Sequence, residues 1–140
     1  MKVILLQPKI GYMDAMRSSP SPPLGLIHAA AELSRHYPVE ILDARLEPDM
    51  ESRLKNALSG DTLFVGITCH TGPMIHSAMH LSRLVKAHSK APVVWGGTHA
   101  SLAPELTLAH PDVDVCAIGE GEHTALELAR AIESGGDLSG

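Results

Sequence analysis

Aromatic side chains are scarce in this sequence of 140 residues. They make up 3% of the chain, as Trp95, Phe64, Tyr12 and Tyr37. The core must therefore be built mainly from aliphatic side chains. A basic cluster is also missing, and the net charge is −5, from 11 basic and 16 acidic residues. This charge pattern argues against a nucleic-acid-binding protein.

Cysteine is rare, and no apolar run is long. Cys69 and Cys116 are too few for a disulfide framework, and each ends an apolar run, where a free buried thiol is common. No apolar stretch approaches the roughly 18 residues of a membrane span. Lys2 leads directly into a strand-like run, without a signal-peptide cleavage site. We therefore expect a cytoplasmic protein with no membrane partner.

The sequence alternates short apolar runs with longer amphipathic segments. The expected strands are residues 3–6, 39–42, 63–67, 92–95 and 113–118. The expected helices are residues 24–36, 48–58, 73–89, 104–110 and 123–133. Apolar strands that alternate with helices predict a parallel sheet covered on both faces. We therefore predict an α/β, flavodoxin-like or Rossmann-like three-layer sandwich, with five parallel strands in the order 2-1-3-4-5.

One domain accounts for most of this length. Residues 1–133 contain all of the expected strands and helices, and we assign them to a single domain. Residues 134–140 are rich in glycine and serine, a composition typical of flexible linkers. We expect them to begin a linker to a further, C-terminal domain.

Small and polar residues follow three of the expected strands. The three stretches are Thr68-Cys69-His70-Thr71-Gly72, Gly96-Gly97-Thr98-His99 and Gly119-Glu120-Gly121-Glu122. In open α/β sheets, ligands bind outside the carboxyl ends of the strands, and glycine lets a ligand approach the backbone closely. Tight turns between strands and helices often contain glycine without any ligand, so one such loop would indicate little. Three such loops at one edge of the sheet predict a ligand site.

The common nucleotide-binding motifs are missing from these loops. No GxGxxG motif follows the first strand, which disfavours a dinucleotide site, and the absence of GxxxxGK[ST] excludes a P-loop. The third strand ends at Thr68 and Cys69, where a receiver-like phosphorylation domain would have an aspartate. A flavin- or nucleotide-binding flavodoxin-like domain and a ligand-free interaction or sensory domain remain as alternatives.

Four stretches, in their order and spacing, form a more specific pattern. They are Gln7-Pro8, Pro22-Pro23-Leu24-Gly25-Leu26, Val94-Trp95-Gly96-Gly97-Thr98-His99 and Ile118-Gly119-Glu120-Gly121-Glu122. With this pattern, nearly the whole chain resembles the N-terminal cobalamin-binding domain of B12-dependent radical SAM proteins. The resemblance implies a corrinoid-binding module of a methyltransferase or of a radical cyclase or rearrangement enzyme.

The resemblance also implies where cobalamin binds. Its nucleotide tail is expected at the carboxyl edge of the sheet, with the long first loop covering the corrin. The implied contacts are Thr68, Cys69, His70, Thr71, Gly96, Gly97, Thr98, His99, Gly119, Glu120 and Gly121, with Pro23 and Gly25 from the first loop. Other B12 domains supply a histidine to cobalt from a DxHxxG motif after strand one. That motif is missing here, so this loop gives no cobalt ligand, and the identity of any other axial ligand stays open.

The catalytic half of a radical SAM enzyme is not present in this sequence. Such an enzyme needs a CxxxCxxC motif for its iron–sulfur cluster, which two distant cysteines do not provide. The resemblance therefore places the [4Fe-4S] cluster and S-adenosylmethionine in a further domain, and this chain alone is expected to bind without catalysing. His76 and His80 lack the glutamate of an HExxH motif, so we expect a solvated helix face there rather than a metal site.

Overall fold

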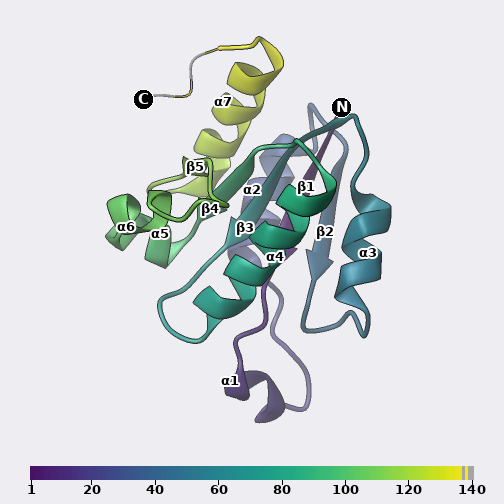
Figure 1. Ribbon diagram of the computed structural model, residues 1–140, viewed down its shortest axis with the longest axis vertical. Helices are drawn as coiled ribbons and strands as arrows, with labels where there is room; N and C mark the ends of the chain where they lie inside the picture. Colours follow the sequence, from purple (N-terminus) through teal and green to yellow (C-terminus); the bar gives the residue numbers. More distant parts are fainter. Residues whose placement is uncertain (137, 139–140) are drawn as a thin grey trace.

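The computed structural model describes residues 1–136 and residue 138, and its centre is a parallel sheet (Figure 1). The strands are β1 (Lys2–Gln7), β2 (Val39–Asp43), β3 (Thr62–Thr68), β4 (Val93–Gly96) and β5 (Val115–Cys116). Their order is β2-β1-β3-β4-β5, and every neighbouring pair is parallel. The predicted fold class and strand order are confirmed.

Helices cover both faces of this sheet. They are α1 (Tyr12–Ala15), α2 (Leu24–Leu33), α3 (Met50–Ala57), α4 (Met74–His88), α5 (Thr98–Leu102), α6 (Pro104–Leu108) and α7 (Gly121–Glu133). Helices α2 and α7 pack side by side on one face, while α3 and α4 cover the other (Figure 1). No helix in the described part of the chain is long and apolar enough to cross a membrane.

The two cores follow from the alternation of side chains along the strands. In β1, Val3 and Leu5 face α2 and α7, whereas Ile4 and Leu6 face α3 and α4. All four are buried, as expected for a central parallel strand. The cores are mainly aliphatic, as the composition predicts. Trp95 lies in the core that faces α3 and α4, where its Nε1 donates a hydrogen bond to Ser82 Oγ at 2.8 Å.

Three local features differ from the expectation. The short helix α1 forms within the first loop, because the Asp14 carboxylate accepts hydrogen bonds from the backbone N–H groups of Ile10 and Gly11. The expected helix over residues 104–110 forms as α6 and ends at Leu108, and an additional short helix, α5, precedes it and meets it at Ala103. Strand β5 covers only two of the expected residues 113–118, and it pairs with β4 alone.

The C-terminal boundary of the predicted domain coincides with the end of a helix. Helix α7 ends at Glu133, and Ser134 caps it with a backbone N–H that donates to Arg130. Residues 137, 139 and 140 of the predicted linker lie outside the described residues. The linker and the domain beyond it therefore stay predictions.

Candidate functional site

A cavity of about 750 Å³ opens at the carboxyl edge of the sheet. The loops after β3, β4 and β5 all contribute to its wall, as the three glycine-containing stretches predict. Ten of the expected site residues line it, namely Thr68, His70, Gly96, Gly97, Thr98, Gly119, Glu120, Gly121, Pro23 and Gly25. The fold thus brings together residues that lie almost 100 positions apart in the sequence.

The cavity continues inward between the sheet and the helices α2 and α7. There its walls are apolar side chains, whereas its rim is built from backbone, hydroxyl and charged groups. The inner walls are Leu5, Phe64 and Val94 from the strands and Leu26, Ala29, Ala125 and Leu128 from the helices. Such a cavity suits an extended ligand that has one apolar group and several polar ones.

Backbone hydrogen bonds join the loops after β3 and β4. Gly97 has φ +91°, and a Cβ at this position would lie 2.9 Å from the backbone oxygen of Cys69. The N–H of Cys69 donates to the Gly96 oxygen at 2.9 Å, and the N–H of His99 donates to the Cys69 oxygen at 3.0 Å. Glycine at position 97 is therefore required for both its backbone conformation and this close approach.

Two hydrogen bonds, each between a histidine and a threonine, connect the loop after β3 with the loop after β4. Nδ1 of His70 and Oγ1 of Thr98 lie 3.3 Å apart, and both residues line the cavity. Oγ1 of Thr71 and Nδ1 of His99 lie 3.1 Å apart. Each loop thus supplies one histidine and one threonine, which fixes the positions of the side chains at the rim.

Three of the expected site residues lie outside the cavity lining. Cys69 is fully buried in the core, and His99 is only 7% exposed, with its ring edge-on to Trp95 at a centroid distance of 6.4 Å. Thr71 is exposed and is the hydrogen-bond partner of His99. None of the three lines the cavity in this structure. Contacts from them to a ligand stay predictions.

Burial makes the Cys69 thiol a poor nucleophile. Desolvation raises the pKa of Cys69 to about 12, so the thiol stays protonated at neutral pH. We expect Cys69 to resist a thiol reagent such as dithionitrobenzoate in the folded protein and to react at once in denaturant. Cys116 is half-buried and serves as the internal comparison. Rapid labelling of both thiols in the native state, read by mass spectrometry, would contradict this placement.

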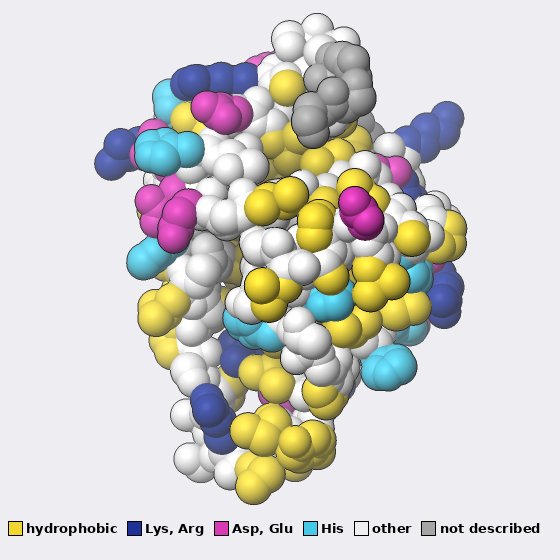
Figure 2. Space-filling view, turned by 90° about the vertical axis from the view of Figure 1, so that its left-hand side faces the viewer, with side chains coloured by type: hydrophobic (Ala, Val, Ile, Leu, Met, Phe, Trp, Pro, Cys, Tyr) yellow, Lys and Arg dark blue, Asp and Glu magenta, His cyan; other side chains and the backbone are white. Residues whose placement is uncertain are grey.

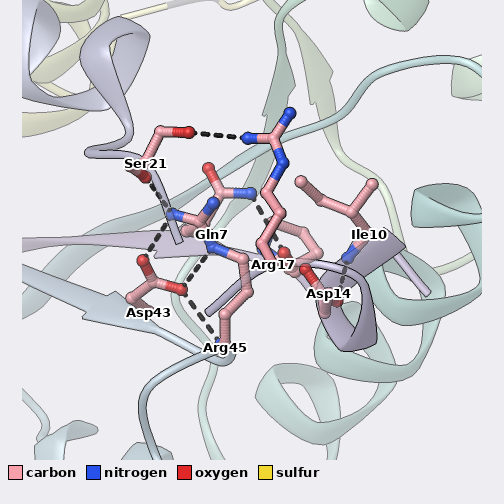
Figure 3. Close-up of polar contacts among 8 residues, drawn as sticks. Gln7, Ile10, Asp14, Arg17, Ser21, Asp43 and Arg45 are labelled. Atoms are coloured by element: carbon pink, nitrogen blue, oxygen red, sulfur yellow. Dashed lines mark hydrogen bonds and ion pairs between the residues drawn. The ribbon is translucent and has the colours of Figure 1, made fainter. Parts of the chain in front are cut away.

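A buried ion pair holds the first loop against the sheet (Figure 3). The Arg45 guanidinium donates to both carboxylate oxygens of Asp43, from Nε at 2.9 Å and from Nη2 at 2.7 Å. It also donates to the backbone oxygen of Ser21 at 2.9 Å. Arg17 Nη1 donates to the Ser21 hydroxyl at 2.7 Å from within the loop itself. These contacts position the segment that carries Pro23 into the cavity wall.

Several residues of this site have no strong signal in the sequence. The lining residues without such a signal are Arg17, Arg45, His28 and Glu122. His28 on α2 and Glu122 on α7 form a pair, with Nδ1 and Oε1 3.3 Å apart. A lone arginine in a long loop resembles any solvated charge, so Arg17 has no local signature. Of these four residues, only Glu122 lies within one of the three glycine-containing stretches.

Comparison with known proteins assigns this fold to a family. A family model described as a B12 binding domain matches residues 14–129. Over 144 residues the chain is 33% identical to an uncharacterized methyltransferase, PH0819, from Pyrococcus horikoshii. The match covers 100% of this chain and 31% of that protein.

Solved structures share the same architecture. The radical S-adenosylmethionine methyltransferase TsrM from Kitasatospora setae, with cobalamin and a [4Fe-4S] cluster bound, superposes with a TM-score of 0.80 at 24% identity. That match covers 98% of this chain and 26% of TsrM. The cobalamin-dependent S-adenosylmethionine radical enzyme OxsB matches with a TM-score of 0.75 at 18% identity, over 98% of this chain and 19% of OxsB. The chain therefore spans less than a third of the length of these proteins.

Because the family model covers most of the sequence, and the fold and its edge cavity agree with it, the chain belongs to the family of B12-binding domains.

Proposed function

We propose that this chain is the cobalamin-binding module of a larger B12-dependent radical SAM enzyme of the cytoplasm. The observation that carries the proposal is the cavity at the carboxyl edge, built by three glycine-containing loops in a member of the B12-binding family. The reaction of the whole protein would be a methyl transfer, or a radical cyclisation or rearrangement. This module would bind and orient the cofactor and leave the catalytic step to the partner domain.

The residues present fit a corrinoid. A Cβ at Gly25 or Gly119, both on the cavity wall, would meet no atom within 4 Å, so the backbone there is open to a bulky ligand. The apolar space between the sheet and the helices α2 and α7 would take the nucleotide base of the cofactor. The hydroxyls of Thr68, Thr98 and Ser101 at the rim would bond its amide side chains. Cobalamin, when bound, supplies a cobalt centre that carries a methyl group or takes part in electron transfer.

Relatives and exposed apolar groups support a partner domain. The P. horikoshii relative is described as a methyltransferase, and TsrM holds a [4Fe-4S] cluster as well as cobalamin. Large hydrophobic side chains around the cavity rim are exposed, including Leu24 at 64% and Leu102 at 75%. Figure 2 shows that hydrophobic side chains also gather at the end of the molecule that carries α1. We propose that a radical SAM domain, with its [4Fe-4S] cluster and S-adenosylmethionine, covers this surface.

A spectrum of the purified domain tests the cofactor. The protein would be mixed with hydroxocobalamin or with flavin mononucleotide, desalted, and scanned. We expect corrin absorbance to stay with the protein at close to one equivalent, and the flavin to be lost. Retention of the flavin without cobalamin would support the flavodoxin-like alternative, and retention of neither would support a ligand-free interaction domain.

A further inference from the structure

The floor of the inner cavity is a row of three residues on neighbouring strands. In the register of the sheet, Gly66 of β3 lies between Leu5 of β1 and Val94 of β4, and all three line the cavity. A Cβ at Gly66 would lie 2.8 Å from Leu5 Cδ2 and 3.5 Å from Phe64 Cε2. Because glycine has no side chain, the space above the middle strand stays open between two apolar neighbours.

The helix walls above this floor are apolar as well. Leu26 and Ala29 of α2 and Ala125 and Leu128 of α7 line the cavity. Alanine on both helices leaves room between them and the sheet. The side chains of this described inner wall therefore consist of carbon and hydrogen only.

The backbone of the inner wall already has its hydrogen-bond partners. Strand β3 pairs with β1 on one side and with β4 on the other, so the polar backbone groups around Gly66 lie within the ladders of the sheet. Ala29, Ala125 and Leu128 lie inside helices, where backbone groups bond along the helix. Among the residues that the structure describes, no buried side-chain nitrogen or oxygen lacks a hydrogen-bond partner. A polar ligand atom in the inner space would find no partner there.

The polar lining residues lie outside this inner wall and bond to other protein groups. Gln7, the last residue of β1, donates from Nε2 to the Pro8 oxygen at 3.0 Å. The Arg45 guanidinium has the carboxylate and carbonyl partners described above. The side chains of His28 and Glu122 are 64% and 45% exposed, and they pair with each other. The cavity thus changes from polar at its rim to apolar at its inner end.

Corrinoids differ in the base that ends their nucleotide tail. The dimethylbenzimidazole of cobalamin has one free ring nitrogen and two methyl groups, whereas an adenine base has an amino group and several ring nitrogens. We propose that the inner wall selects corrinoids by this base and binds an apolar benzimidazole in preference to a purine. The amino group of adenine would lose its water without gaining a partner, while the methyl groups would gain apolar contacts. This inference rests on the proposed function, because it needs a corrinoid in the cavity.

Calorimetric titration of the purified domain with three corrinoids tests the selection. They are cyanocobalamin, the cyano form of the corrinoid with an adenine base, and cobinamide, which has no nucleotide tail. We expect cobalamin to bind at least about 10-fold more tightly than the adenine form, because burial leaves a polar group of adenine without a partner. Cobinamide should also bind more weakly than cobalamin, since it leaves the inner space empty.

The variant Leu128→Gln places an amide group in the inner wall. It is expected to reduce the preference for cobalamin over the adenine form by about fivefold, because the amide can form a hydrogen bond with the purine. Leu106→Gln is the matched control, since Leu106 is 69% exposed on α6 and lies outside the cavity lining. It should leave the preference unchanged. Properties of the free corrinoids are the same for every variant and cancel in this comparison, and circular dichroism checks that each variant is folded.

The other outcomes separate the selection from the proposed function. Equal affinities of the wild type for cobalamin and the adenine form would overturn the selection, and so would a preference that Leu128→Gln leaves unchanged. Cobinamide that binds as tightly as cobalamin would overturn it too, because the base would then contribute nothing. In each of these cases the bound cobalamin would leave the proposed function intact. A domain that binds none of the three corrinoids would refute both.

Discussion

Replacing Ala125 with tryptophan is expected to weaken cobalamin binding by about 100-fold, or about 2.7 kcal/mol. Ala125 lies on α7 and lines the inner, apolar part of the cavity. An indole at this position would occupy the space between the sheet and α2 that we assign to the nucleotide tail. The fold should persist, because the new side chain enters an existing cavity rather than a filled core.

The matched control for this change is Glu127→Trp on the same helix. Glu127 is exposed and does not line the cavity, so its replacement should leave the affinity within about twofold of the wild type. Calorimetric titration with hydroxocobalamin measures both variants, and circular dichroism checks that each is folded. If Ala125→Trp bound cobalamin as tightly as Glu127→Trp, the apolar space between the sheet and these helices would not be part of the binding site.

Replacing Arg45 with alanine is expected to lower the free energy of unfolding by about 3 kcal/mol, because it leaves the Asp43 carboxylate without its partner. The side chains of Arg45 and Asp43 are 6% and 10% exposed. The hydrogen bond with Asp43 raises the pKa of the Arg45 guanidinium, although burial acts in the opposite direction. Loss of the bond from Arg45 to the Ser21 oxygen would also release the first loop from the sheet.

Urea denaturation measures this effect, with Lys55→Ala as the comparison. Lys55 pairs with Glu51 at 2.7 Å on the surface of α3, and both side chains are at least 40% exposed. Its loss should cost no more than about 0.5 kcal/mol. If Arg45→Ala destabilised the protein no more than Lys55→Ala, the buried pair would not hold the first loop.

The sequence was sufficient to predict the sheet because each strand is a local signal. Strand β3 is an unbroken apolar run, and glycine-containing stretches follow β3, β4 and β5. Parallel order then places these stretches at one edge, which is how residues as distant as Thr68 and Gly119 could be assigned to one site. Composition and periodicity carry this part of the prediction without tertiary information.

The orientation of individual side chains was harder to predict. Thr68 and His70 line the cavity, whereas Cys69 between them is buried in the core and Thr71 after them is not a lining residue. Side chains of an extended chain point alternately to its two sides. Continuing the alternation of β3 through residue 71 would therefore have predicted which of these side chains line the cavity. His99 follows a different rule, since it lies on α5 and turns toward Trp95.

Long-range polar contacts could not be predicted at all. The contact between Arg45 and Ser21 joins residues 24 positions apart, and the pair of His28 and Glu122 joins two helices. Neither has a spacing or motif that distinguishes it from ordinary surface charge. Such contacts depend on how loops pack after the sheet has formed, which a single sequence does not encode in a local pattern.

The central claim is that cobalamin binds at the carboxyl edge of this sheet, and amide chemical-shift mapping tests it most directly. The ¹⁵N-labelled domain would be titrated with hydroxocobalamin, and the backbone amides of Gly97, Gly119 and Gly121 should shift or broaden. The amides of Gly60 and Ala91, at the opposite edge, should stay unchanged. Shifts confined to that opposite edge, or no shifts at saturating cobalamin, would contradict the account.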